Sequence, residues 1–293
     1  MALAVGLVGC ASTSTSTLAS PAGSKPGVAK PTAWVTTTAS LDSGGRARTY
    51  VVARPAQVTA QRLPVLLFLH GRDVTPEQEL QRDGFEAVVG RAILVYPAGF
   101  GQSWNAGACC GVAQAQGVDD VAYLTAVVQR VLATQPDSAP GQVYLAGYSN
   151  GGKMAYRLSC ADPRLFAAVA VYAATETSAC APRPVVSFLL VASTADPDLT
   201  MGPGGAPQAA AGFVEPTVTA ETAAYRRADG CGAASGHQVV VGSVGVTTWS
   251  ACQAGTRVAQ VLYPGGNHAW PGGGGATPAG AALIWTWMRG GSA

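Results

Sequence analysis

Short apolar runs recur along most of this chain, and they alternate with stretches of helical periodicity. Several runs are apolar at every position rather than at every second one, which is typical of strands buried on both faces of a sheet. Because strands and helices alternate, the sequence predicts an α/β fold in which helices wrap a mostly parallel sheet. The predicted strands are Trp34–Thr38, Arg48–Ala53, Val65–Leu69, Ala92–Tyr96, Gln142–Ala146, Ala167–Tyr172, Val185–Ala192 and Arg257–Tyr263.

We expect the first two strands to form an antiparallel edge of the sheet. Val239–Val241 and Val244–Trp249 are predicted to form a small hairpin insertion. A helix is predicted to begin at Asp119-Asp120, because acidic residues suit the first turn and the apolar residues that follow share one face. The other predicted helices are Pro76–Val89, Asn150–Leu158, Pro216–Ala228 and Pro278–Met288.

Composition excludes several classes of protein. Charged residues make up 12% of the chain, about half of the usual share, which raises the question of a membrane protein. The longest apolar stretch after the N-terminal region, Leu165–Ala174, has however only about half of the roughly 20 residues that a membrane-spanning helix needs. A net charge of +2 without a Lys/Arg cluster argues against nucleic acid as a partner. A hydrophobic content of 48% excludes bulk disorder. We therefore expect a globular protein, with residues 34–290 as a single domain and a monomer as its oligomeric state.

The N-terminal residues predict an exported protein. Leu7-Val-Gly-Cys10 resembles the bacterial lipobox, whose cysteine is lipidated, although the leader is short, as if truncated, and has no basic residue before it. An alternative is that Cys10 is merely a cysteine near a frayed terminus. Residues 11–33 are small, polar or Pro, which predicts a flexible linker. Such a linker behind a lipid anchor would tether the domain outside the cytoplasm, and this anchor is the only membrane contact that we expect.

Six further cysteines, an even number, indicate disulfides in an exported chain. We pair Cys231 with Cys252, because they flank the predicted hairpin. The other four allow three connectivities, of which the vicinal bond is disfavoured because it would strain the backbone. A zinc site is rejected, since the spacings do not fit and no histidine lies nearby. Those four are Cys109, Cys110, Cys160 and Cys180.

Gly147-Tyr-Ser149-Asn-Gly151 matches the pattern G-x-S-x-G of a serine nucleophile. In a chain this rich in glycine the pattern alone is weak, so its context decides. A predicted buried strand ends directly before it and a predicted helix starts directly after it, as this turn requires. A sharp strand-to-helix turn exposes the serine oxygen above the sheet. Ser149 is therefore the predicted nucleophile.

A serine nucleophile needs an imidazole base and an acid that orients it. On α/β-hydrolase folds the acid and then the histidine follow the serine in the chain, which excludes His70 as the base. His237 is interpreted as a surface residue of the hairpin. His268, in a Gly-rich loop after the last strand, is the predicted base, and Asp196, just beyond a buried strand, is the predicted acid, with Asp198 as its near rival.

Amide donors must face the oxyanion of a tetrahedral intermediate. The backbone N–H of Asn150 is one predicted donor. The second is expected from Gly71 or Arg72, in the loop after a buried strand, and His70 is expected to support that loop.

Nine short motifs carry a resemblance to a known family. They are Leu69-His-Gly71, Tyr96-Pro97, Ser103-Trp-Asn105, Ala108-Cys-Cys-Gly111, Gly117-Val-Asp-Asp-Val121, Gly147-Tyr-Ser-Asn-Gly-Gly152, Met154-Ala-Tyr-Arg-Leu158, Thr194-Ala-Asp-Pro197 and Gly266-Asn-His-Ala-Trp-Pro-Gly272. In this order they resemble the poly(3-hydroxybutyrate) depolymerase-like esterases, which are related to feruloyl and acetylxylan esterases. The resemblance spans about residues 34–290 and implies an α/β-hydrolase fold.

The resemblance also implies roles for individual residues. Ser149, Asp196 and His268 take the catalytic roles, and Trp270 lies near the substrate. Trp104 would do likewise or pack in the core, and Tyr148 is a further candidate for substrate contact. The chain departs from the family at Ala192-Ser-Thr194, at the stretch from Asp198 to Pro203, and at Lys153, which stands where an apolar residue is more common.

The sequence thus predicts an exported serine esterase that acts on carboxylic esters, polymeric or small. The esters are of the polyhydroxyalkanoate, feruloyl or acetyl-polysaccharide type, and no metal or organic cofactor is implied. One rival is an acyltransferase of the mycolyltransferase type on the same fold. Another is a non-catalytic surface binding protein, against which the complete triad argues.

Overall fold

The computed structural model describes residues 1–2, 33–57, 60–205, 208–232 and 236–291. Cys10 and most of the predicted linker lie outside these residues. The chain from Thr32 onward forms one compact unit. Its strands are β1 (Trp34–Ser43), β2 (Arg46–Pro55), β3 (Leu63–Leu69), β4 (Ile93–Pro97), β5 (Ser138–Tyr148), β6 (Ala168–Tyr172), β7 (Ser187–Ser193), β8 (Ala209–Ala210), β9 (Phe213–Val214), β10 (Gly236–Val241), β11 (Val244–Trp249) and β12 (Val258–Tyr263).

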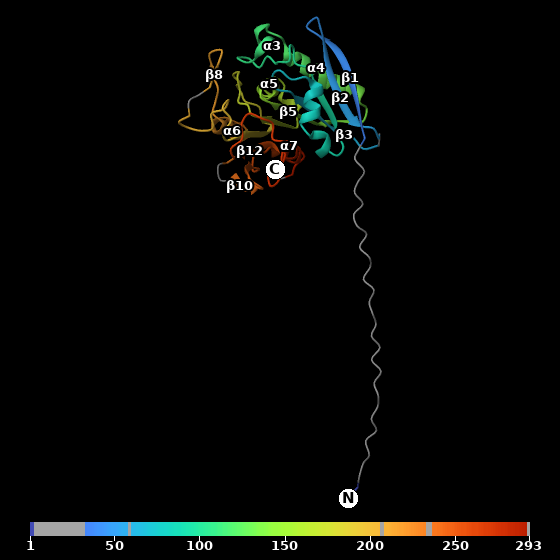
Figure 1. Ribbon diagram of the computed structural model, residues 1–293, viewed down its shortest axis with the longest axis vertical. Helices are drawn as coiled ribbons and strands as arrows, with labels where there is room; N and C mark the ends of the chain where they lie inside the picture. Colours follow the sequence, from blue (N-terminus) through green and yellow to red (C-terminus); the bar gives the residue numbers. More distant parts are fainter. Residues whose placement is uncertain (3–32, 58–59, 206–207, 233–235, 292–293) are drawn as a thin grey trace. The chain divides into compact units, whose positions relative to one another are not determined.

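The central sheet has the strand order β1-β2-β4-β3-β5-β6-β7-β12-β11-β10 (Figure 1). The strands from β4 to β12 in this order run parallel, and an antiparallel hairpin extends each edge. The chain leaves β3 for β4 on one side and returns to place β5 on the other. The loops after β3 and β5 therefore diverge, which is where ligands bind in open α/β sheets.

Helices cover both faces of this sheet. They are α1 (Pro76–Arg82), α2 (Phe85–Val88), α3 (Gly111–Ala115), α4 (Asp120–Thr134), α5 (Asn150–Ala161), α6 (Val218–Ala228) and α7 (Gly280–Met288), with short 3₁₀ turns η1 (Pro163–Leu165) and η3 (Gln253–Gly255). The helices pack into two hydrophobic clusters. One cluster contains apolar residues of α4, α5 and α6, and the other contains those of α2 and α7, with α1 packed against it.

The predicted mostly parallel sheet and its antiparallel first edge are confirmed. The predicted hairpin is confirmed as β10 and β11, which extend the central sheet through β12. Val244 and Val246 are buried, so one face of this hairpin joins the core. The single helix predicted over Pro76–Val89 is wrong. It divides at Gly84, whose φ of +79° lies in the left-handed region that glycine adopts without strain.

The structure joins the cysteines as Cys109–Cys110, Cys160–Cys180 and Cys231–Cys252. The predicted Cys231–Cys252 pair agrees with this. The preference against a vicinal bond was wrong. The peptide bond between Cys109 and Cys110 is cis, and their Cα atoms lie 3.1 Å apart.

Three largely buried ion pairs connect separate segments of the chain. Arg48 of β2 pairs with Asp120 of α4 at 2.8 Å, and the two side chains are 4% and 0% exposed. Arg183 pairs with Glu221 of α6 at 2.8 Å, and Lys153 of α5 with Glu215 at 2.6 Å. A chain with few charged residues thus uses several of them inside the fold.

His70 lies in a buried polar network beneath the diverging loops. Its Nε2 accepts the backbone N–H of Gly99 at 2.9 Å, and since that group can only donate, Nδ1 carries the proton and donates to the carbonyl of Gly71 at 2.7 Å. The indole N–H of Trp104 donates to the carbonyl of His70 at 2.9 Å. The imidazole therefore joins the loop after β3 to the loop after β4 and is held neutral.

This network predicts a pH dependence of stability. Burial lowers the pKa of His70 to about 4, whereas an unfolded histidine titrates near about 6.5. Between these values only the unfolded chain takes up the proton, so this residue makes the free energy of unfolding fall as the pH drops through the window. His70→Gln should reduce the pH dependence of the free energy of unfolding by up to about 1.4 kcal/mol per pH unit. It should also lower the free energy of unfolding at pH 7 by about 1–3 kcal/mol. Urea unfolding between pH 4 and 7 measures both, and a variant with the slope of the wild type would contradict the role of His70.

Candidate active site

Ser149 stands at the turn between β5 and α5, with φ 53° and ψ −121°. This sparsely populated conformation is what a strand-to-helix turn imposes on its central residue. The flanking glycines are sterically required. A Cβ on Gly147 would lie 2.3 Å from the carbonyl oxygen of Gly151, and one on Gly151 would lie 2.0 Å from that of Leu69. The predicted G-x-S-x-G turn therefore depends on both glycines for its close backbone contacts.

The structure brings Ser149, His268 and Asp196 together in one hydrogen-bonded chain. His268 Nδ1 lies 2.9 Å from Asp196 Oδ2 and 3.0 Å from Oδ1, and since a carboxylate can only accept, Nδ1 carries the proton. Nε2 is then free to accept the hydroxyl proton of Ser149, with a separation of 2.7 Å. The arrangement can move a proton from Ser149 to the imidazole and stabilise the imidazolium that results.

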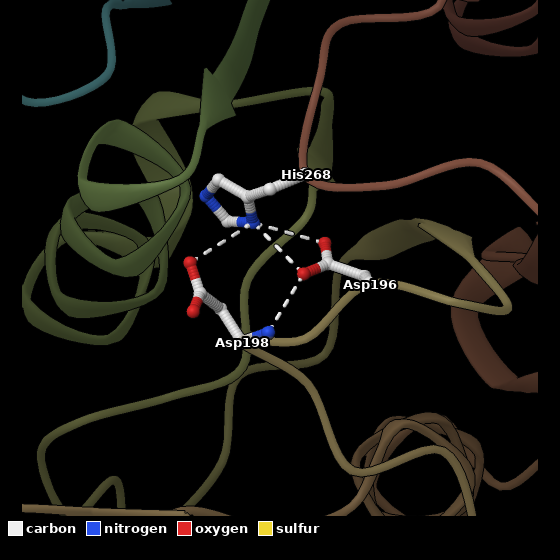
Figure 2. Close-up of side chains that lie close together, drawn as sticks. All are labelled: Asp196, Asp198 and His268. Atoms are coloured by element: carbon white, nitrogen blue, oxygen red, sulfur yellow. Dashed lines mark hydrogen bonds and ion pairs between the residues drawn. The ribbon is translucent and has the colours of Figure 1, made fainter.

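Figure 2 shows how the acidic residues lie around the imidazole. The carboxylate of Asp196 is 0% exposed and also accepts the backbone N–H of Asp198 at 2.9 Å. The side chain of Asp198 is 66% exposed, with Oδ2 at 3.5 Å from Nδ1 of His268. The ligand atoms of these three residues lie within 4.8 Å of one another, a spacing compatible with a metal ion. The Nδ1 proton of His268 already lies among the carboxylate oxygens, so the two aspartates orient the imidazole rather than share a metal ion with it.

Two tyrosines hold the loop that carries the imidazole. The hydroxyl of Tyr148 donates to the carbonyl of His268 at 2.5 Å, and the hydroxyl of Tyr172 donates to the carbonyl of Ala269 at 2.6 Å. Tyr172 also shares a hydrogen bond of 3.0 Å with Ser193, at the end of the strand that precedes Asp196. Sequence reasoning missed this role of Tyr172. The only signal was its position, at the carboxyl end of the strand beside the one that carries Ser149.

A pocket of about 450 Å³ opens beside Ser149 and His268. Gly71, Arg72 and Asn150 line it, as expected of the oxyanion residues. A Cβ on Gly71 would lie 3.7 Å from that of Ser149, so the loop backbone passes close to the nucleophile. Other lining residues carry charge or belong to the vicinal disulfide: Asp73, Arg82, Cys109, Cys110, Lys153, Asp198 and Glu215.

The aromatic residues expected near the substrate divide into two groups. Tyr148 lines the pocket. Trp104 does not reach it, because its side chain is 0% exposed and packs against His70 in the core. Trp270 is half-buried and packs edge-on against Tyr172, and its indole donates to the carbonyl of Asp83 at 3.0 Å. Of the two roles expected of Trp104, the structure shows core packing, and Trp270 anchors the histidine loop to Asp83 and Tyr172.

Asn150 has a second function that the sequence did not suggest. Its side-chain oxygen accepts the backbone N–H of Trp104 at 2.8 Å, and its side-chain amide donates to the carbonyl of Trp104 at 3.0 Å. Asn105, which follows Trp104 in the chain, donates its backbone N–H to the carboxylate of Asp120 at 2.8 Å. The first residue after the nucleophile is therefore tied to the loop after β4, and through it to α4.

Solved structures establish the fold. The chain is similar to the acetyl xylan esterase from Aspergillus awamori, with a TM-score of 0.59 and 12% identity over 86% of this chain and 99% of that one. It is also similar to a cold-adapted esterase from an Arctic intertidal metagenomic library, with a TM-score of 0.51 and 14% identity over 80% of this chain and 86% of that one. At these identities the likeness shows the α/β-hydrolase fold alone.

No protein-family model matches the chain. A curated protein of Nocardia uniformis subsp. tsuyamanensis, "Putative esterase NocK", is 32% identical over 266 residues, which are 83% of this chain and 77% of that protein. Identity at this level over most of both chains establishes common family membership. The chain therefore belongs to the same esterase family as NocK, and the protein is a carboxylic ester hydrolase.

Proposed function

We propose that the protein hydrolyses its esters through a Ser149–His268–Asp196 triad and an acyl-enzyme intermediate. The observation that carries this proposal is the continuous hydrogen-bonded chain from Ser149 Oγ through the imidazole to the buried carboxylate of Asp196. A serine hydroxyl becomes a competent nucleophile only beside such a base.

In the proposed reaction Ser149 Oγ bonds to the ester carbonyl carbon while its proton passes to Nε2 of His268. The tetrahedral intermediate then expels the alcohol, which takes up that proton, and leaves an acyl-serine ester. Water attacks this ester in the same way, gives its proton to Nε2, and releases the carboxylic acid and the free serine. Asp196 holds the imidazole in orientation and stabilises it while it is charged.

The oxyanion would be bound by backbone N–H groups at the mouth of the pocket. Asn150 supplies one from the first turn of α5, where the helix dipole favours negative charge. Gly71 or Arg72 supplies the second, from the loop that the neutral His70 supports. Each such donor commonly contributes about 10²–10³ in rate.

The proposed substrates are esters of the polyhydroxyalkanoate, feruloyl or acetyl-polysaccharide type. This class rests on the nine motifs shared with the depolymerase-like esterases. The charged and polar lining of the pocket supports it, since such a surface suits hydroxyl-rich or short acyl groups better than long hydrocarbon chains.

We also propose that the protein works outside the cytoplasm as a monomer. Residues 34–290 would form the esterase domain, and residues 11–33 would link it to a lipid on Cys10. Three disulfides support an oxidising compartment. No helix among the described residues is long and apolar enough to span a membrane.

Ser149→Ala should abolish hydrolysis of p-nitrophenyl acetate, with a loss of kcat/KM of at least about 10³-fold, because the acyl enzyme of the proposed mechanism forms on the Ser149 hydroxyl. A panel of acetyl, feruloyl and 3-hydroxybutyrate esters should show the same loss for every ester that the wild type cleaves. Ser243→Ala, an exposed hydroxyl of the β10–β11 turn, is the matched control and should keep full activity. Turnover by the Ser149 variant would disprove the proposed mechanism.

Tyr172→Phe should lower kcat by about tenfold with little change in KM, because the loss of one hydroxyl removes the bond from Tyr172 to Ala269 of the histidine loop and its bond to Ser193. The control is Tyr263→Phe, which removes a similar bond, of 3.0 Å, to the carbonyl of Pro278. Equal kinetics for the two variants would argue against a specific role for the Tyr172 hydroxyl.

Protein expressed in a bacterial host that processes lipoproteins should carry a lipid on Cys10, visible as added mass on the N-terminal peptide. Cys10→Ser should lose that mass and move the activity from the membrane fraction to the soluble one. An unmodified Cys10 in the wild type would disprove lipid anchoring and leave the triad untouched.

A further inference from the structure

Asp198 places a second carboxylate against the imidazole of His268. Its Oδ2 lies 3.5 Å from Nδ1, while the oxygens of Asp196 lie at 2.9 and 3.0 Å. Figure 2 shows the two carboxylates on either side of Nδ1. One ring nitrogen, with one proton to donate, therefore faces three carboxylate oxygens.

The two carboxylates differ in their surroundings. Asp196 is buried and within ordinary hydrogen-bond distance of Nδ1, whereas Asp198 is 66% exposed and lies beyond it. The backbone N–H of Asp198 also donates to Asp196 Oδ1, at 2.9 Å. The backbone of Asp198 thus helps to orient Asp196, and its side chain acts on the imidazole through charge.

We infer that Asp198 is a positioning residue for the esterase reaction. Its carboxylate helps to keep the proton on Nδ1 of His268 and stabilises the imidazolium formed in the transition state. This inference rests on the proposed triad. A unit charge about 4 Å away changes an equilibrium by about fivefold even in bulk water, so an exposed carboxylate at this distance has a measurable effect. In the variant Asp196→Asn, Asp198 is the carboxylate that remains at Nδ1.

The test measures kcat and KM for p-nitrophenyl acetate in two comparisons. The first compares Asp198→Asn with Asp198→Glu, and the second compares Asp196→Asn with the double variant Asp196→Asn/Asp198→Asn. Asp198→Asn keeps the size of the side chain and the backbone N–H that donates to Asp196, so it removes only the charge. Asp42→Asn is the matched control. Asp42 is an exposed carboxylate of the edge strand β1 and does not line the active-site pocket.

We expect Asp198→Asn to lower kcat by about fivefold with KM unchanged, and Asp198→Glu to restore most of that loss. The double variant should be at least about tenfold less active than Asp196→Asn alone, because it leaves no carboxylate to fix the position of the Nδ1 proton. The Asp42 variant should keep its kcat. Thermal melting of each variant checks that the fold is intact.

Two results would overturn the inference. One is a kcat of Asp198→Asn equal to that of the wild type, together with a double variant as active as Asp196→Asn. The other is a raised KM at unchanged kcat, which would place Asp198 on the substrate. Either result leaves the proposed triad standing, since Ser149→Ala tests the triad separately.

Discussion

The side-chain amide of Asn150 bonds both backbone groups of Trp104, and the arrangement of the site depends on this contact. It joins the turn that carries Ser149 to the loop after β4. That loop is fixed further by the His70 imidazole and by the contact of Asn105 with Asp120. Such a network is strong only when each buried polar group has a partner. The nucleophile, the proposed oxyanion loop and the first residues of α4 are therefore held as one unit.

Much of the fold was predictable because the relevant signals are local. The apolar runs marked the parallel strands, and G-x-S-x-G between a strand and a helix marked Ser149, whose flanking glycines have no room for a Cβ. With only three histidines in the chain and a fixed order of functional residues, His268 was the simplest choice. Asp196 followed from its position after a buried strand.

The features that sequence reasoning missed depend on contacts between distant segments. The bond of Tyr172 to Ala269 spans the gap between β6 and the loop after β12, and no local pattern records it. Trp104 reads equally well as a pocket residue or a core residue until its burial is known. The vicinal Cys109–Cys110 pair is one of three connectivities that the four cysteines allow, and composition does not distinguish among them. Gly84 was included in the predicted helix Pro76–Val89, whereas its left-handed φ separates α1 from α2.

The buried ion pairs of Arg48 with Asp120 and of Arg183 with Glu221 have a consequence for how the fold responds to salt. Dissolved salt screens charges that face water, but it screens pairs removed from water far less. With these pairs among its few charged residues, the chain draws part of its cohesion from contacts that ions in solution hardly reach. Its fold is in this respect suited to surroundings of variable ionic strength.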